Sequence, residues 1–368
     1  MARGKRIVVK VGTSTLTGAD GRVDREWLAD LARQASGLRE RGAEVIVVTS
    51  GAIAAGVESL GLPSRPTELT GLQAAAAVGQ VRLIGTYAEI MRERDIPIAQ
   101  VLITRHDTGH RQAYVFACRT LDRLLEMGVL PVINENDTTA VEEIRFGDND
   151  TLAALVGVMV NADLVVLLTD IEGLYDHDPQ SVDDAVLLEH IEELTDEVMA
   201  AAGGSGSEHG TGGMATKLEA ARILMKAGIP MVVCDGRRPD VLLDAFAGEP
   251  VGTYFAGGQG EVEARKLWIA FARHPKGTIV VDAGARDALC LRGTSLLPAG
   301  VVGTKGRFAA GDAVAIVDTN GAPIARGLSD VSSDDLERLK GHNSAEIARI
   351  APDLAGREVV HRDRLVIL

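Results

Sequence analysis

The first 260 residues alternate short apolar runs with longer amphipathic stretches. Continuous apolar runs predict buried strands, and the stretches between them predict helices. The strand-like runs cover residues 7–11, 45–48, 98–103, 129–133, 164–168 and 231–234. The helix-like stretches cover residues 24–41, 72–94, 112–127, 151–160 and 215–227, with Asp24 as the predicted N-cap of the first. Strands buried on both faces that alternate with helices predict an α/β domain with a doubly wound, mainly parallel sheet.

This pattern changes near residue 275. Short β-rich runs now recur between glycines, at residues 277–282, 313–318, 323–325 and 358–368. They predict a small, mostly β second domain. A chain of 368 residues is also too long for one ordinary core. We therefore expect a first domain at residues 1–260, a linker at 261–274 and a β domain at 275–368.

Charge is distributed unevenly between these two parts. The net charge is −14, yet residues 275–368 carry 12 basic and 12 acidic side chains, so the excess of acids lies in the first 274 residues. A general nucleic-acid binder needs basic surface, and this composition argues against one. The three cysteines, Cys118, Cys234 and Cys290, are far apart. Their spacing fits a reducing cytoplasm and argues against a disulfide framework or a zinc site.

No membrane location is expected from the sequence. No apolar run reaches the eighteen or so residues that a spanning helix requires. The first residues lack the apolar stretch and cleavage site of a signal peptide. We expect a cytoplasmic protein.

Small and polar residues follow three of the predicted strands. They are Gly12-Thr13-Ser14, Ser50-Gly51-Ala52 and Thr169-Asp170. Ligands of open α/β sheets bind outside the carboxyl ends of the strands, where small residues let a ligand approach the backbone. An ordinary turn would account for any one of these ends, but three together favour a ligand site.

A glycine-rich loop at residues 203–213 leads into Met214-Ala215-Thr216-Lys217 and a predicted helix. Free amides at a helix N-terminus bind phosphate oxygens, and Lys217 adds a positive charge beside them. The alternative is a plain surface loop. The P-loop pattern is absent, and a G-x-G-x-x-A match at residues 210–215 is not directly preceded by a strand. Protein-kinase motifs are absent as well.

Charged and amide side chains supply two further candidates. Lys10 lies inside an apolar strand, where an unpaired charge is costly, so an anionic partner is expected unless the side chain reaches solvent at the strand end. Residues 134–137 (Asn-Glu-Asn-Asp) and 147–150 (Gly-Asp-Asn-Asp) are rich in acids and amides. Such groups can hold an amino group, orient lysines or hold hydrated Mg²⁺. A solvated turn is the alternative, and the spacing does not match an EF-hand calcium loop.

These candidates suit phosphoryl transfer better than base-assisted catalysis. No convincing set of nucleophile, histidine and acid is found in the sequence. Phosphoryl transfer needs alignment and positive charge around the moving group. A carboxylate acceptor is already ionised at pH 7, so the reaction requires no general base. Two lysines, a glycine loop and Mg²⁺ would suffice, and no residue is assigned as a direct metal ligand.

Several segments together resemble the glutamate 5-kinase family of the amino acid kinase superfamily. They are residues 8–14, 50–52, 134–137, 146–150 and 210–217. The residues after 275 resemble the C-terminal PUA domain of that family, an RNA-binding type of β fold. The resemblance implies ATP- and Mg²⁺-dependent phosphorylation of the side-chain carboxylate of L-glutamate to L-glutamyl 5-phosphate, the first step of proline biosynthesis.

The resemblance also implies residue roles. Lys10 and Lys217 would offset the charge of the transferring phosphoryl group, and Asp150 would orient them. Glutamate would be held by Ser50, Asp137 and Asn149. ATP would be bound by Lys10, Thr169, Asp170, Thr211, Gly212, Gly213, Met214, Ala215, Thr216 and Lys217.

Implied partners are proline as a feedback inhibitor, glutamyl phosphate reductase as the consumer of the product, and further copies of the chain in a dimer or tetramer. Two alternatives remain open: another amino acid kinase acting on N-acetylglutamate or aspartate, and an RNA-binding regulatory protein. The neutral second domain gives RNA binding little support. Residues 114–119 (Tyr-Val-Phe-Ala-Cys-Arg) depart from the Tyr-Leu-Asn-Ala-Arg type of segment in the family. This departure concerns oligomer contacts and regulation more than catalysis.

Overall fold

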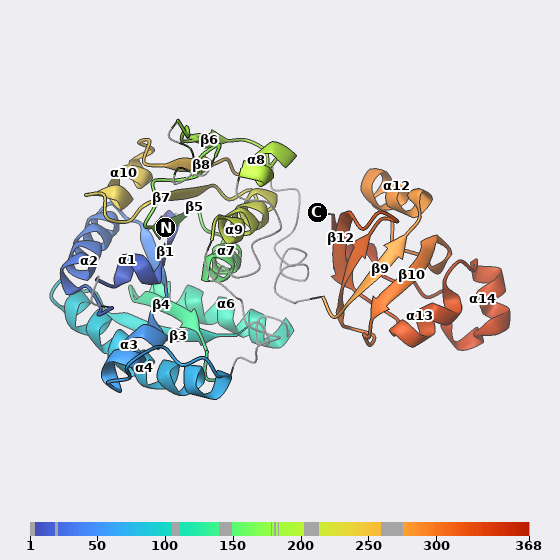
Figure 1. The fold of residues 1–368 in the computed structure, drawn as a ribbon, viewed down its shortest axis with the longest axis horizontal. Coiled ribbons are helices and arrows are strands. Elements are labelled where there is room, and N and C mark those ends of the chain that lie inside the picture. Colours follow the sequence, from blue (N-terminus) through green and yellow to red (C-terminus); the bar gives the residue numbers. More distant parts are fainter. Residues whose placement is uncertain are drawn as a thin grey trace. The chain divides into compact units, whose positions relative to one another are not determined.

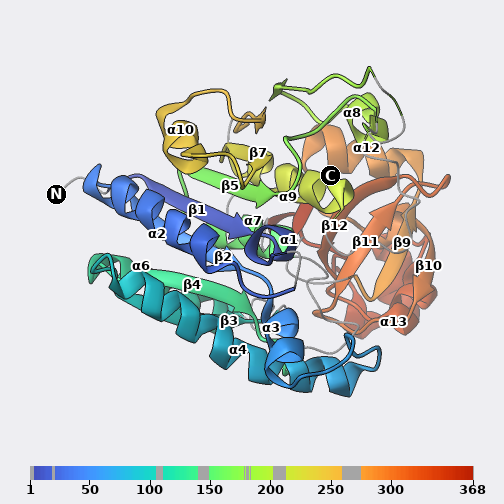
Figure 2. The same ribbon diagram turned by 60° about the vertical axis from the view of Figure 1, so that its left-hand side comes forward.

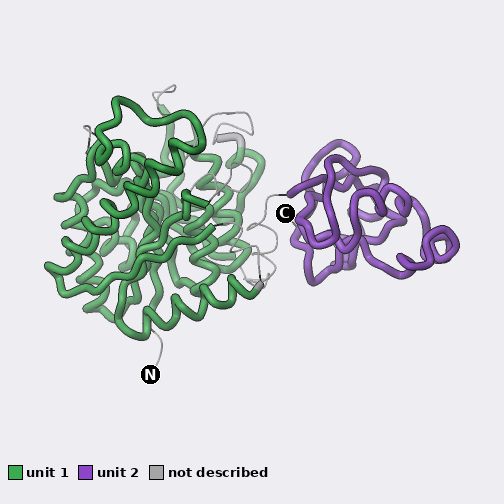
Figure 3. Tube along the Cα trace, turned by 90° about the horizontal axis from the view of Figure 1, so that it is seen from below, with its two compact units in different colours: residues 1–261 green, residues 262–368 purple. Residues whose placement is uncertain are grey.

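A computed structural model describes residues 4–18, 21–104, 111–139, 149–177, 179, 182, 184–201, 213–258 and 275–367. The chain divides into two compact units, residues 1–261 and 262–368 (Figure 3). The predicted linker lies outside the described residues. The limits expected for the two domains, residues 1–260 and 275–368, therefore stay predictions.

The first unit is built on an eight-stranded sheet with the order β3-β4-β2-β1-β5-β7-β8-β6 (Figure 1). Its strands are β1 (Arg6–Val11), β2 (Glu44–Thr49), β3 (Ile98–Ile103), β4 (Leu130–Glu135), β5 (Leu164–Thr169), β6 (His190–Ile191), β7 (Met231–Asp235) and β8 (Thr253–Phe255). Strands β7 and β8 pair antiparallel, and the other neighbours pair parallel. The predicted mainly parallel sheet is confirmed, while β6 and β8 were not predicted.

Helices connect these strands. They are α1 (Thr13–Leu16), α2 (Arg25–Glu40), α3 (Ala52–Ser59), α4 (Leu69–Arg92), α6 (Arg111–Glu126), α7 (Asn149–Met159), α8 (Asp196–Ala201), α9 (Met214–Lys226) and α10 (Val241–Ala247). Asp24 caps α2 as predicted, because its carboxylate accepts a hydrogen bond from the Trp27 amide at 3.0 Å. All five predicted helices are confirmed, whereas α1, α3, α8 and α10 were not predicted.

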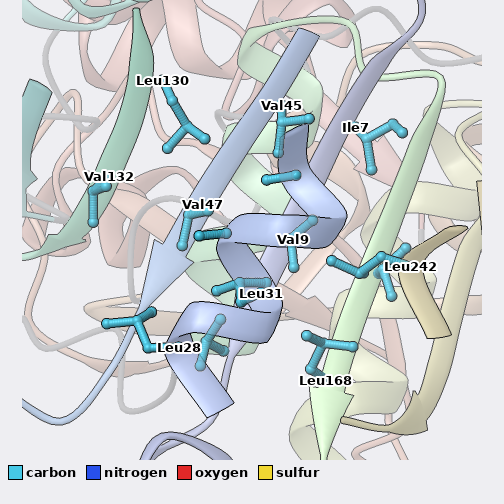
Figure 4. Packing of buried hydrophobic residues seen from close by; sticks show 14 of the residues in the cluster. Ile7, Val9, Leu28, Leu31, Val45, Val47, Leu130, Val132, Leu168 and Leu242 are labelled. Carbon is cyan, nitrogen blue, oxygen red and sulfur yellow. The ribbon is translucent and has the colours of Figure 1, made fainter. Parts of the chain in front are cut away.

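The two faces of the central strands carry different layers. Alternate side chains of a strand point to opposite faces. One face of β1, β2, β4 and β5 packs against α2, α4 and α10 in a single apolar cluster. Figure 4 shows members of this cluster, including Val9, Val47 and Leu168 from the sheet and Leu31 from α2. The other face is covered by α7 and α9, which lie side by side (Figures 1 and 2). The even-numbered residues of β1 therefore face α7.

The second unit contains a five-stranded sheet with the order β10-β9-β11-β12-β13. Its strands are β9 (Gly277–Val281), β10 (Val301–Gly306), β11 (Ala313–Val317), β12 (Pro323–Leu328) and β13 (Leu365–Ile367), and its helices are α12 (Ala283–Arg292), α13 (Ser333–Leu339) and α14 (Ser344–Ile350). Its two recorded apolar clusters share no residue with the cluster described for the first unit. The continuous strand expected at residues 358–368 is wrong, because Arg362–Arg364 forms a 3₁₀ turn before β13.

In the described parts of both units, no helix is both long and apolar enough to cross a membrane.

Candidate active site

Lys10, Asp150 and Lys217 form one buried charged centre in the first unit. Lys10 Nζ lies 2.6 Å from Asp150 Oδ1, and Lys217 Nζ lies 3.1 Å from Asp150 Oδ2. The Asp150 side chain is fully buried, and the two lysine side chains are 7% and 6% exposed. One carboxylate thus holds two ammonium groups, one on each oxygen. The three side chains together carry a net charge of +1 inside the protein.

Three different elements bring these groups together. Lys10 is the fifth residue of β1, and its even position directs it to the face that α7 covers. Asp150 is the second residue of α7, where the helix dipole favours a negative charge. Lys217 lies in the first turn of α9, where the dipole disfavours a positive charge. Neither burial nor the dipole stabilises Lys217 in this place, and its ion pair with Asp150 offsets part of the cost.

A second polar cluster lies at the carboxyl ends of β2 and β4. Asn149 Nδ2 lies within hydrogen-bond distance of the Thr49 carbonyl oxygen (2.8 Å), Ser50 Oγ (2.8 Å) and Asn134 Oδ1 (3.1 Å). An amide group has only two hydrogens, so three acceptors share them. Because Ser50 accepts here, its own hydroxyl hydrogen is available to a ligand. The backbone turns into α3 at Gly51, whose φ of 93° suits glycine.

The first loop of the unit leaves a small space beside Lys10. A Cβ atom built on Gly12 would lie 3.7 Å from both Lys10 Nζ and Thr15 Oγ1. The Thr15 hydroxyl is buried and has no hydrogen-bond partner among the described residues. An ammonium group and an unsatisfied hydroxyl therefore face the same glycine, an arrangement that fits a phosphoryl oxygen.

Among the described residues expected to bind the nucleotide, Thr169, Asp170 and those at the start of α9 lie on the other side of β1 from this polar cluster. Thr169 ends β5 and its hydroxyl lies 3.2 Å from Asp170 Oδ1. Gly213 is the N-cap residue of α9. Because glycine has no side chain, it cannot accept hydrogen bonds from the first backbone amides of this helix through a side chain. Thr216 Oγ1 lies 3.1 Å from Asp150 Oδ2, which joins α9 to the charged centre a second time.

Strand order explains how these clusters are arranged. Strands β4, β2, β1 and β5 are neighbours and run parallel, so their carboxyl ends lie along one edge. Asp137 follows β4, Ser50 follows β2, Lys10 is near the end of β1, and Thr169 ends β5. Ser50 and Asp137 of the expected glutamate set and Thr169 of the expected ATP set therefore lie on opposite sides of Lys10. The chain reverses its winding direction at β1, the position where α/β sheets bind ligands.

Some expected residues are not placed, and other residues were missed. Thr211 and Gly212 lie outside the described residues. Asp137 is half-buried after β4. Asn134 was named as part of a motif but given no role, although it contacts Asn149. Tyr87, which lies behind the Ser50 loop, was missed because a single tyrosine in an alanine-rich helix gives no signal in the sequence.

The remaining chemistry of the described residues is sparse. All three cysteines are free. Burial raises the pKa of the Cys234 thiol to about 12, with a smaller contribution from the Asp235 charge. In the parts of the chain that the structure describes, no group of three His, Cys, Asp or Glu side chains could hold a metal ion.

Comparisons with known proteins identify the family of each unit. Residues 5–235 match the amino acid kinase family, and residues 277–351 match the PUA domain. A glutamate 5-kinase of Geobacter sp. (strain M21) is 48% identical over 364 residues, covering 99% of this chain and 98% of the relative. A glutamate 5-kinase of Caldanaerobacter subterraneus subsp. tengcongensis is 48% identical over 363 residues, with the same coverage.

A solved structure shares the fold of the first unit. Carbamate kinase from Giardia lamblia bound to AMP-PNP superposes with a TM-score of 0.51 at 17% identity, over 70% of this chain and 99% of that one. The fold, the charged centre and the family match together define an amino acid kinase, and the chain belongs to the amino acid kinase family. Because the named relatives are 48% identical over 99% of this chain, the chain belongs more narrowly to the glutamate 5-kinase family.

Proposed function

We propose that this chain transfers the γ-phosphoryl group of ATP to the side-chain carboxylate of L-glutamate. The product is L-glutamyl 5-phosphate, and the reaction is the first step of proline biosynthesis. The observation that carries the proposal is the buried Lys10–Asp150–Lys217 centre, between the ends of β2 and β5. Full-length relatives named glutamate 5-kinase support the choice of substrate.

The reaction balances without a protein base. A glutamate carboxylate oxygen attacks the γ-phosphorus, and the bond from that phosphorus to the β–γ bridging oxygen breaks. The electron pair of the broken bond leaves with ADP. No proton moves, so the three side chains of the charged centre need not include a base. The transferring group gains negative charge on its outer oxygens, where cationic donors stabilise it.

Each lysine has a defined task in this proposal. Lys10 and Lys217 donate hydrogen bonds to oxygens of the transferring phosphoryl group. Asp150 holds both ammonium groups in a fixed geometry, at 2.6 and 3.1 Å, so little reorganisation is needed as charge develops. Thr216 supports the same carboxylate from α9 at 3.1 Å.

Substrates are held on opposite sides of this centre. We assign glutamate to Ser50, Asn149 and Asp137, whose hydroxyl, amide and carboxylate groups match its two carboxylates and its amino group. We assign ATP to Thr169, Asp170 and the segment from Gly213 to Lys217 at the start of α9. Lys10 contacts ATP as well. Thr211, Gly212, Met214, Ala215 and Thr216 complete the predicted nucleotide set. Mg²⁺ would supply charge neutralisation on the ATP phosphates.

Trapping with hydroxylamine tests the proposal. Purified protein with Mg²⁺, ATP and hydroxylamine should form a coloured hydroxamate with L-glutamate and none with L-aspartate or N-acetyl-L-glutamate. Omitting ATP or Mg²⁺ should abolish the product. Hydroxamate formation with N-acetylglutamate or aspartate but not with glutamate would replace this assignment by another amino acid kinase.

Further roles extend the same proposal. Proline would inhibit as the end product, glutamyl phosphate reductase would consume the labile acyl phosphate, and the chain would act as a dimer or tetramer in the cytoplasm. Family membership and the pathway position support these assignments.

A further inference from the structure

Tyr87 is a buried tyrosine of α4 that contacts a strand end in the candidate active site. Its side chain is fully buried, and its hydroxyl lies 3.0 Å from Thr49 Oγ1. Thr49 is the last residue of β2 and is 2% exposed. A buried phenol hydroxyl needs a partner, and here that partner adjoins Ser50.

The direction of this hydrogen bond follows from the proton count. Thr49 Oγ1 has one hydrogen, which it donates to the Ser50 carbonyl oxygen at 3.1 Å. Tyr87 must then be the donor to Thr49. Burial raises the pKa of Tyr87 above its usual value, so the phenol keeps its proton. The order of donation is Tyr87 to Thr49 to the Ser50 backbone.

The same stretch of backbone is held from its other side by α7. Asn149 donates to the Thr49 carbonyl oxygen and to Ser50 Oγ, both at 2.8 Å. The short segment at Thr49 and Ser50 is therefore fixed between α7, which carries Asp150, and α4. Hydrogen bonds on two sides leave it little freedom to change its ψ and φ angles.

We propose that Tyr87 is a positioning residue for the carboxylate substrate, acting through Thr49 on the geometry of Ser50. This inference rests on the proposed function. Tyr87 does not touch the substrate in this proposal; it sets the orientation of a group that does. Its loss should weaken glutamate binding and leave the nucleotide side, beyond β1, unchanged.

Tyr87→Phe removes the hydroxyl and keeps the ring in the core. We expect the KM for glutamate to rise about fivefold, the effect of one neutral hydrogen bond, with the KM for ATP unchanged. Thr86→Val is the matched control, because Thr86 is the preceding residue of α4 and its buried hydroxyl donates only within the helix, to the Arg82 carbonyl oxygen at 3.0 Å. It should leave both KM values at wild-type levels.

Substitutions at Thr49 change the other partner of the Tyr87 hydrogen bond. Thr49→Val should raise the KM for glutamate as Tyr87→Phe does, and Thr49→Ser, which keeps a hydroxyl, should restore it. Adding Tyr87→Phe to Thr49→Val should cause no further rise, because the two changes break one chain of hydrogen bonds.

The outcomes separate this inference from the proposed function. If wild-type protein forms no glutamyl hydroxamate, the proposed function fails. If the wild type is active but Tyr87→Phe matches Thr86→Val, or raises both KM values equally, the positioning role is refuted. A Tyr87→Phe protein that does not fold leaves the decision to Thr49→Val and Thr49→Ser, and equal KM values for these two would refute it as well.

Discussion

At the scale of single residues, the proposed phosphoryl transfer depends on two ammonium groups that share one buried carboxylate. Sequence alone indicated that Lys10 needed an anionic partner, because it interrupts an apolar strand. The strand pattern did not indicate which carboxylate would supply the charge, since Asp150 is 140 positions away along the chain. Only the family resemblance implied Asp150. The partner depends on how α7 crosses β1, which is a property of the fold.

Lys217→Ala removes one of the two ammonium groups. We expect kcat to fall by about 10²–10³-fold, by analogy with the loss of one preorganised donor to a developing charge. The circular dichroism spectrum and the melting temperature should stay near those of the wild type. Lys226→Ala, at the other end of α9, is the control and should keep wild-type turnover. Near-normal kcat in Lys217→Ala would remove Lys217 from the mechanism.

Asp150→Asn keeps the shape of the side chain and removes its charge. Two ammonium groups would then remain buried without the carboxylate between them. We expect the free energy of unfolding to fall by about 3–5 kcal/mol, as when one partner of a buried ion pair is deleted. Urea unfolding measures this loss. Asp196→Asn, at an exposed first-turn position of α8, should change the value by less than about 0.5 kcal/mol, and an equal loss in both variants would contradict the account.

At the scale of elements, periodicity predicted the buried strands and the long amphipathic helices, because burial on both faces of the sheet leaves continuous apolar runs. It missed α3, whose sequence Ala-Ile-Ala-Ala-Gly-Val-Glu-Ser has no polar stripe. It also missed β6 and β8, which are two and three residues long, too short for any periodicity to be seen. The candidate glutamate cluster adjoins both α3 and α4, so periodicity predicted the α4 part of its support and missed the α3 part.

The contact between α3 and α4 depends on glycines. A Cβ atom at Gly79 would overlap the backbone oxygen of Ala52, and one at Gly56 would overlap that of Ala75. The two helix backbones are therefore in direct contact. Because α3 begins immediately after Ser50 and Gly51, this contact also fixes the direction in which that loop leaves the sheet.

Gly79→Ala would force the two helices apart. We expect it to destabilise the protein by at least about 1–3 kcal/mol, the usual cost of overpacking, and to raise the KM for glutamate more than that for ATP. Gly85→Ala is the control in the same helix. A Cβ atom at Gly85 meets nothing within 4 Å, so this change should stabilise the helix by about 0.5–1 kcal/mol. Thermal melts and steady-state kinetics check both, and equal effects would refute the packing argument.

At the scale of the whole molecule, the apolar clusters recorded for the described residues each lie within one of the two compact units, which indicates two folding units. All candidate site residues belong to the first unit. We propose that the kinase activity resides in residues 1–260, with residues 275–368 as a regulatory or structural addition. The charge distribution along the sequence already suggested this division, since the excess of acidic residues stops near residue 275.

A chain that ends at residue 260 tests this division. It should fold cooperatively and form glutamyl hydroxamate with a kcat within about an order of magnitude of the full chain, because no candidate site residue is removed. A truncated chain that folds, as judged by circular dichroism, but forms no hydroxamate would show that the second unit completes the active site.

The path of one oxygen atom shows whether the glutamate carboxylate accepts the phosphoryl group. L-Glutamate labelled with ¹⁸O in its side-chain carboxylate is incubated with the full chain, ATP, Mg²⁺ and hydroxylamine, and the released phosphate is examined by ³¹P NMR. If the carboxylate attacks the γ-phosphorus, hydroxylamine then expels a phosphate that carries one ¹⁸O atom. Release of phosphate without ¹⁸O would mean that water or another group accepts the phosphoryl group, and would contradict the account.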